Sequence, residues 1–364
     1  MNILVINTAA EYAGSLSILQ DFYKEVKKLE KNINWFFCVS NVEYIDQFSA
    51  NILDFSWTKK SWFHRFFFDY FIVRKLVKKL KIDALFSMQN VTFPGVRVRQ
   101  IVYFHQSIQF SPYRYRLFKK EEMNFWVRQN IISRYMKKSL NNSFAIIVQS
   151  SWFKDRVENW LYPKKIQIRI IKPVIHNYNA REYDLNSARN NFFYPAGGGH
   201  HKNHDLIIDA CIELKLANIN NYAVFFTLNG NENAYVKKIA LKVKKHNLPI
   251  FFIGNLSKDE VFKYYSICTL LFPSTIETFG LPLLEGIIAK SIIFSSDLPF
   301  AHEILDEYNN VSYFDPFDSK FLCNLMRMNI DNTITYNYIS NFKIVADSLL
   351  TKAVIELASG VQHE

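Results

Sequence analysis

Cysteine is scarce in this chain, and long apolar runs are missing. The four cysteines among 364 residues lie far apart in the sequence, which argues against a disulfide framework and a clustered metal site. Apolar runs such as 66–73 and 250–253 are short or interrupted by charge, so none reaches the ~20 residues of a transmembrane helix. The N-terminus enters an apolar strand at residue 2 without a basic lead, so we expect no signal peptide. These absences predict a globular, cytoplasmic protein.

Acidic residues are scarce in the first half of the chain. Residues 1–176 contain 28 Lys and Arg against 13 Asp and Glu, a balance of +15, whereas residues 177–364 contain 16 and 20, a balance of −4. Such asymmetry indicates that the first half meets a polyanion: nucleic acid, an anionic membrane or a pyrophosphate-bearing substrate. No nucleic-acid-binding motif accompanies the charge, so we expect no nucleic acid.

Short apolar strands alternate with helices along the whole chain. Strands are expected at 3–6, 35–39, 84–87, 100–104, 145–149, 166–171, 191–194, 223–228, 250–253, 269–272 and 292–295. This alternation predicts an α/β fold with parallel, doubly wound sheets, and the chain length suits two domains. With a polar linker at 176–190, we place an N-terminal domain at 1–176, a C-terminal domain at 177–340 and a final helix in 341–364.

The stretch 272–285, Phe-Pro-Ser-Thr-Ile-Glu-Thr-Phe-Gly-Leu-Pro-Leu-Leu-Glu, is the most informative one. An apolar strand ends here and a proline opens a helix, so free N–H groups around Gly280 and Leu281 make a site for a phosphate. The carboxylates of Glu277 and Glu285 flank that site, and as acceptors they would bind hydroxyl groups. An anion flanked by polyols describes a nucleotide-sugar. The alternative is an ordinary strand–turn–helix with two solvated glutamates.

This stretch resembles the E-x7-E signature of retaining glycosyltransferases of family 4. Glu277 and Glu285 have its spacing within Pro-Ser-x-x-Glu-x-Phe-Gly-Leu-Pro-x-x-Glu, where Phe279 precedes the glycine. The resemblance implies a GT-B fold of two facing Rossmann-like domains, with a cleft between them and a C-terminal helix crossing back onto the first. Domain 1–176 would then bind the acceptor, and domain 177–340 would bind the nucleotide-sugar donor. It also implies transfer of a hexose-type sugar from a nucleotide-diphosphate sugar to a hydroxyl, with retention. Glu277 would then hold sugar hydroxyls and Glu285 ribose hydroxyls. No strand-linked Asp-x-Asp motif is present, so we expect no essential metal and no other cofactor.

A glycine-rich loop at 195–204, Pro-Ala-Gly-Gly-Gly-His-His-Lys-Asn-His, follows the strand at 191–194. Glycines let the backbone approach a ligand closely, and a lysine near a helix start can neutralise phosphate. The loop resembles the family 4 loop whose Arg and Lys hold the donor diphosphate. Only the Lys matches, because glycine stands where the Arg usually does, and His200 or His201 is a candidate substitute. The donor-site residues expected in this loop are Gly198, Gly199 and Lys202.

Four further positions are candidates through the same resemblance. Gly230 and Gly254 end strands where the family lines its base and ribose pocket, and Gly14 matches a glycine that opens the first helix. His105 follows a strand end, where the family has a histidine on the donor sugar's hydroxyls near the reacting carbon. The catalytic group is then Lys202, Glu277 and His105. Tight turns and a satisfied loop histidine are the alternatives.

Residues 57–81 carry eight Lys and Arg against one acid, interleaved with aromatic side chains, and residues 111–138 repeat this character, with a dense cluster at 113–120. Basic, aromatic stretches lie well on anionic bilayers, so we expect membrane contact at 57–68, peripheral on the inner face of the plasma membrane. The alternative is a solvated basic face over a Rossmann core.

The acceptor is expected to be a lipid-pyrophosphate-linked O-antigen or capsule glycan. A soluble acceptor, as in sucrose or glycogen synthesis, and a non-catalytic glycan-binding GT-B scaffold stay open.

Overall fold

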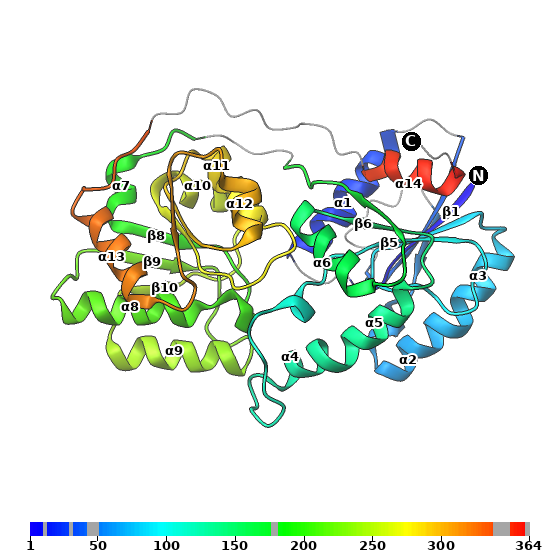
Figure 1. The fold of residues 1–364 in the computed structure, drawn as a ribbon, viewed down its shortest axis with the longest axis horizontal. Helices are drawn as coiled ribbons and strands as arrows, with labels where there is room; N and C mark the ends of the chain where they lie inside the picture. The colour runs from blue at the N-terminus through cyan, green and yellow to red at the C-terminus, as the bar shows by residue number, and fades with distance from the viewer. Residues whose placement is uncertain (10–12, 29–31, 42–50, 176–180, 338–349, 361–364) are drawn as a thin grey trace. The chain divides into compact units, whose positions relative to one another are not determined.

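The structure is a computed structural model that describes residues 1–9, 13–28, 32–41, 51–175, 181–337 and 350–360 (Figure 1). It divides into two compact units. The first comprises Met1–Gln106, Ile131–Pro173 and Asp347–Glu364, and the second comprises Ser107–Asn130 and Val174–Ala346. Segment 107–130 therefore groups with the second unit, although it lies within the predicted N-terminal domain. Part of the predicted linker, 176–180, lies outside the described residues.

The first unit is built on a parallel sheet of seven strands in the order β3-β2-β1-β4-β5-β6-β7. The strands are β1 (Asn2–Asn7), β2 (Asn34–Val39), β3 (Asn51–Asp54), β4 (Ala84–Ser87), β5 (Arg99–Tyr103), β6 (Ala145–Val148) and β7 (Gln167–Ile170). Its helices are α1 (Ala13–Lys28), α2 (Trp62–Phe67), the π-helical turn η2 (Phe68–Ile72), α3 (Val73–Lys79), α5 (Ser133–Leu140), α6 (Ser151–Leu161) and α14 (Leu350–Ser359). The short 3-10 turn η1 (Ser56–Lys59) precedes α2.

Two apolar clusters hold this sheet. In one, Phe22 of α1 and Val354 and Leu357 of α14 pack with Phe37 and Phe86 of the strands. The C-terminal helix thus completes a core that the N-terminal residues begin. In the other cluster, side chains of η2 and α3 pack on β1, with Phe68 and Val73 fully buried.

The second unit is built on a parallel sheet of six strands in the order β10-β9-β8-β11-β12-β13. The strands are β8 (Asn191–Tyr194), β9 (Ala223–Phe226), β10 (Ile250–Phe252), β11 (Thr269–Phe272), β12 (Ile293–Ser296) and β13 (Val311–Phe314). Its helices are α4 (Met123–Val127), α7 (Leu185–Asn190), α8 (His204–Leu216), α9 (Ala234–His246), α10 (Lys258–Ile267), α11 (Leu281–Ile288), α12 (Pro299–Leu305) and α13 (Ser319–Ile330). Short turns are η3 (Ile108–Phe110) and η5 (His200–Lys202). One of the boundaries between the units, Asn130/Ile131, falls in the π-helical turn η4 (Arg128–Ile132). Helices α8 and α9 cover one face of the sheet and α10 to α12 the other (Figure 1).

The prediction of parallel, doubly wound α/β sheets is confirmed, and all eleven predicted strands are present. Two strands were not predicted: β3 and β13, each four residues long and each at the edge of its sheet. Among the described helices, none has both the length and the apolar character needed to cross a membrane.

Candidate active site

The candidate site lies at the carboxyl edge of the second sheet, where the strand order reverses between β8 and β11. These strands are neighbours, and in such sheets ligands bind outside the carboxyl ends at the reversal point. The loop 195–203 follows β8, and the loop 273–280 follows β11. Gly230 and Gly254, with φ of 89° and 73°, follow β9 and β10 at the same edge.

Hydrogen bonds tie these two loops together. The Tyr194 hydroxyl lies 2.8 Å from the Lys202 carbonyl, to which it donates, and 2.8 Å from the Ser274 hydroxyl. The backbone N–H of Thr275 donates to the His201 carbonyl over 2.9 Å. Asn203, in the left-handed conformation at φ 59°, donates from its side chain to the Pro273 carbonyl over 3.2 Å. The loops therefore form one framework although about 70 residues separate them.

This framework brings Lys202 and Glu277 into contact. The Lys202 Nζ donates to Glu277 Oε1 over 2.5 Å, and the two side chains are 21% and 14% exposed. A partly exposed cation and carboxylate at a strand edge present one group for phosphate oxygens and one for hydroxyls.

Two glycines are needed for the local geometry. Gly280 precedes α11 with φ 102° and ψ 55°, a conformation that side chains rarely adopt. A Cβ on Gly198 would lie 2.3 Å from Val236 Cγ2, so a side chain there would clash with the Val236 side chain of α9. Gly199 precedes η5. The helix α11 begins at Leu281, one residue before the proline, and the Phe279 side chain is buried. Leu281 thus provides one N–H group at the helix start, while Phe279 can offer only its backbone.

Glu285 lies on α11, one turn after Leu281, and accepts a hydrogen bond from the Tyr265 hydroxyl at 2.9 Å. Burial raises the pKa of its carboxyl from 4.5 to about 6, and the Tyr265 hydrogen bond offsets part of this rise. Desolvation disfavours a charged carboxylate that has too few donors. Ligand hydroxyls would supply donors that the protein does not.

Segment 107–130 adds a buried carboxylate that the sequence did not single out. Glu122 is fully buried and accepts hydrogen bonds from the Tyr113 hydroxyl at 2.8 Å and Lys119 Nζ at 2.6 Å. The Arg116 backbone N–H and guanidinium also donate to it, at 2.9 and 3.2 Å. Burial alone would raise the pKa of Glu122, but these hydrogen bonds hold it well below its usual range. Its only sequence signal, an acid after a basic run, is shared by its neighbour Glu121.

Aromatic side chains of this segment pack on the glycine-rich loop. The His200 ring lies between those of Tyr113 and Tyr235, with centroids 5.0 Å from each, and the Phe125 ring lies 5.9 Å from that of His201. Burial lowers the pKa of His200 and, more strongly, that of His201. A lowered pKa favours the neutral ring in both histidines, and a role for either one beside Lys202 stays a prediction.

His105 and Gly14 lie in the first unit. Gly14 is the second residue of α1, and its surroundings lie outside the described residues. His105 follows β5, and its backbone N–H donates to Asn90 Oδ1 over 2.7 Å. Burial lowers the pKa of His105 to about 4, so its ring is neutral at pH 7. In the described parts of the chain, no three His, Cys, Asp or Glu side chains converge as metal ligands, and the four cysteines are free.

Comparisons with known proteins concern the family and the fold. Residues 178–343 match the family model of the group 1 glycosyl transferases. The O-antigen chain mannosyltransferase RfbU of Salmonella typhimurium is 24% identical over 200 residues, which are 53% of this chain and 53% of that protein. This chain thus spans about half the length of that relative.

Solved structures of similar fold cover nearly the whole chain. WaaG, a glycosyltransferase involved in lipopolysaccharide biosynthesis, matches with a TM-score of 0.66 and 15% identity, over 100% of this chain and 96% of that one. HepE of Anabaena, solved with UDP-glucose, matches with a TM-score of 0.65 and 14% identity, over 92% and 90%. At such identities the likeness establishes the fold, and the predicted GT-B class is confirmed.

Proposed function

We propose that this chain, a GT-B protein whose residues 178–343 form a group 1 glycosyl transferase domain, is a retaining, metal-independent glycosyltransferase. It would move a hexose-type sugar from a nucleotide-diphosphate sugar to a hydroxyl of a glycan. The contact of Lys202 with Glu277 supports the proposal, because a cation of the kind that binds phosphate and a carboxylate of the kind that accepts from hydroxyls lie 2.5 Å apart at the strand reversal. Glu285 follows on the helix that begins beside them.

In this mechanism the donor diphosphate replaces Glu277 as the ion-pair partner of Lys202. Negative charge grows on the leaving phosphate as the glycosidic C–O bond breaks, and Lys202 and the N–H groups at Gly280 and Leu281 stabilise it. Glu277, released from its ion pair, accepts hydrogen bonds from the sugar hydroxyls, and Glu285 accepts hydrogen bonds from the ribose hydroxyls. The acceptor oxygen attacks from the face that the phosphate leaves, and a phosphate oxygen takes its proton. No protein base is assigned.

The proposed acceptor is a glycan linked to lipid pyrophosphate at the membrane. In the first unit, α2 exposes Trp62 and Phe63 at 80% and 72%, beside the exposed Lys59 and Lys60. These side chains are not part of the core, and they suit an anionic bilayer surface. RfbU and WaaG bear names that refer to O-antigen and lipopolysaccharide. In the second stretch, 113–120, the side chains of Tyr113, Arg116 and Lys119 bind Glu122 instead.

The donor site is tested with Lys202→Ala and Glu285→Ala. Lys202→Ala should lower kcat by up to ~10²-fold because it removes charge stabilisation made mainly in the transition state. Glu285→Ala should weaken binding of the nucleotide-sugar, measured by thermal shift. Lys245→Ala, an exposed lysine near the end of α9, is the matched control and should behave as wild type.

Wild-type turnover in both site variants would overturn the donor-site assignment. The reaction type has its own test, because NMR of the product linkage reports the anomeric configuration and EDTA tests the need for a metal. Inversion, or loss of activity with EDTA, would contradict the proposed mechanism. Donor binding without nucleoside diphosphate release, over a range of lipid-linked and soluble acceptors, would favour the non-catalytic scaffold.

A further inference from the structure

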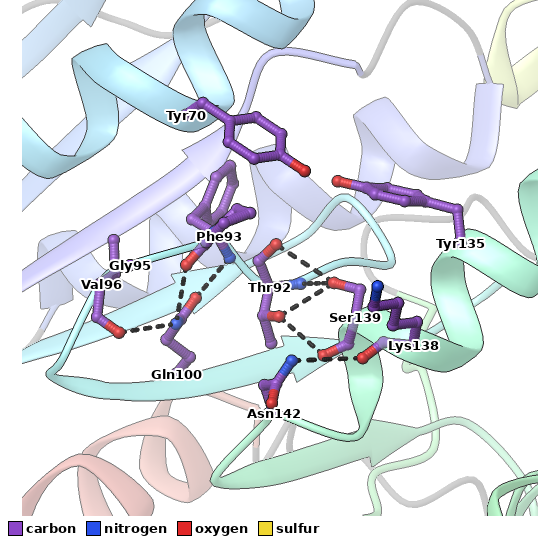
Figure 2. Close-up of a pocket in the computed structure, with 11 residues that line it drawn as sticks. Tyr70, Thr92, Phe93, Gly95, Val96, Gln100, Tyr135, Lys138, Ser139 and Asn142 are labelled. Carbon is purple, nitrogen blue, oxygen red and sulfur yellow. Dashed lines mark hydrogen bonds between the residues drawn. The ribbon is translucent and has the colours of Figure 1, made fainter.

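A cavity of about 470 Å³ lies in the first unit, between η2, the loop 92–96 and α5 (Figure 2). Gln100, at the start of β5, lies on its wall, whereas His105 follows the other end of that strand. The cavity is therefore separate from the carboxyl edge of the sheet. Its volume falls within the ~300–1,000 Å³ of typical small-molecule sites.

The walls of the cavity are fixed by their own hydrogen bonds. Thr92 donates from its backbone to the Ser139 hydroxyl over 2.7 Å and from its hydroxyl to the Ser139 carbonyl over 2.8 Å. The Gln100 side chain accepts from the Phe93 N–H at 2.6 Å and donates to the Phe93 carbonyl at 3.1 Å. Because these polar groups bond to one another, the cavity has a preformed shape. They are not the groups that would bind a ligand.

The opening carries hydrogen-bond donors. Tyr70 and Tyr135 point their hydroxyls toward one another across it, and Lys138 lies beside them on α5 (Figure 2). Among the residues that the structure describes, the Lys138 ammonium has no ion-pair partner. Burial raises the pKa of Tyr135 to about 12, so its hydroxyl stays protonated.

Positive charges outnumber negative ones near the opening. The nearby carboxylate, Asp69, is neutralised by Arg65, whose Nε lies 3.1 Å from both of its oxygens. Arg74 packs on Gly95 of the wall, and its Nε donates to the Pro94 carbonyl over 2.6 Å. Donors and unpaired positive charge at one opening select an anion with several acceptor oxygens, such as a phosphate.

An apolar surface begins at the same opening. The Tyr70 ring stacks on that of Phe66 at a centroid distance of 4.1 Å. Phe66, Phe67 and Phe71 are 50%, 40% and 50% exposed on the continuous helix formed by α2 and η2. A ligand that satisfies both parts has a phosphate and long apolar chains.

We propose that this cavity binds the phosphate head group of an anionic membrane phospholipid, whose acyl chains lie along Phe66, Phe67 and Phe71. The inference rests on the proposed membrane placement of the first unit and adds a single stoichiometric lipid site to it. The phosphate diester accepts from Lys138, Tyr70 and Tyr135. The occupant is a lipid, not free phosphate, because the aromatic surface leads directly from the opening.

The test uses the full chain and dihexanoyl phosphatidylglycerol below its micelle concentration, with calorimetric titration. We expect saturable binding of one lipid per chain, and Lys138→Gln should weaken it about tenfold, the usual effect of losing one charged hydrogen bond. Tyr70→Phe should weaken it by a smaller factor. Lys137→Gln, the same charge change at the preceding residue, which does not line the cavity, should leave it unchanged.

Inorganic phosphate and dihexanoyl phosphatidylcholine complete the titrations. Phosphate binding as tight as the lipid would identify an inorganic anion site and overturn the lipid assignment. Equal lipid affinity of the Lys138 and Lys137 variants, or non-saturable binding, would overturn the assignment of a lipid site to this cavity. No nucleotide-sugar enters these titrations, so their outcome is independent of the proposed glycosyl transfer. The thermal shift that a nucleotide-sugar gives should be the same in Lys138→Gln and wild type.

Discussion

At the scale of single residues, the carboxyl of Glu285 links donor binding to pH. Its pKa is raised to about 6 by burial, so without donor the folded chain holds this proton more tightly than the unfolded chain. The stabilisation that this bound proton contributes to the folded state is therefore largest below pH 4.5, and it is lost as the pH rises through about 6. Ribose hydroxyls that donate to the carboxylate would favour the ionised form, so donor binding should release a proton in this range.

We therefore expect nucleotide-sugar affinity to rise about tenfold between about pH 5 and 7 and to level off above. Tyr265→Phe should move the midpoint upward, because it removes the hydrogen bond that favours the charged carboxylate. Both phosphates of the donor are esterified, so the ligand does not titrate in this range. Dissociation constants measured across pH decide this, with Glu285→Gln as the control that should lose the dependence. A flat wild-type profile would contradict the assigned role of Glu285.

The contact of Lys202 with Glu277 follows from sequence by a short argument. Each residue follows an apolar strand, and doubly wound order makes those two strands neighbours. Glu122 did not follow from sequence, because its donors lie at 113, 116 and 119 in a run whose composition equally suits a membrane surface. Composition shows which charged and aromatic side chains are present, but only the fold shows whether they bind one another or face solvent.

At the scale of elements, segment 107–130 is a strap that lies on the glycine-rich loop, and the buried side chains of Glu122 and Gln129 bind its residues to one another. Edge strands show the limits of sequence patterns here. β3 and β13 are partly exposed along their length, so neither has the continuous apolar run that marks the central strands. The central strands of both sheets were all predicted.

Replacing Glu122 should loosen this strap. Glu122→Gln keeps the shape but leaves Arg116 and Lys119 without their carboxylate, so unfolding should cost about 1–3 kcal/mol less. The donor KM should also rise, because Tyr113 and Phe125 pack on the histidines that precede Lys202. Glu121→Gln, the adjacent carboxyl, is the control and should change stability by less than ~0.5 kcal/mol. Denaturant titration measures the stability, and initial rates measure the donor KM. Equal behaviour of the Glu122 and Glu121 variants would show that this segment has no part in the donor site.

At the scale of the whole molecule, charge separates the two halves of the chain, with +15 in residues 1–176 and −4 in residues 177–364. The aromatic side chains of α2 lie where positive charge is dense, and that combination predicts binding to anionic bilayers. Exposed charges are screened beyond ~8–10 Å at physiological salt, so the binding should weaken as salt is added.

Lys59→Gln with Lys60→Gln should lower partitioning to phosphatidylglycerol vesicles about thirtyfold, since each basic residue near such a surface contributes about 1 kcal/mol. Arg65 is kept, because its ion pair neutralises the buried Asp69. Lys244→Gln with Lys245→Gln, on α9 of the second unit, is the matched control. Sedimentation with and without phosphatidylglycerol measures both. Equal pelleting of the two double variants would assign 57–68 to a solvated face.

The position of α14 has a consequence for synthesis on the ribosome. The cluster around Phe22 and Phe86 is covered by Val354 and Leu357, which are translated only after the entire second unit. At ~5–20 residues per second, one face of the first sheet waits roughly 10–35 s for its last helix, while the second unit can fold on its own. Nascent chains stalled before residue 350 should therefore expose apolar surface of the first sheet.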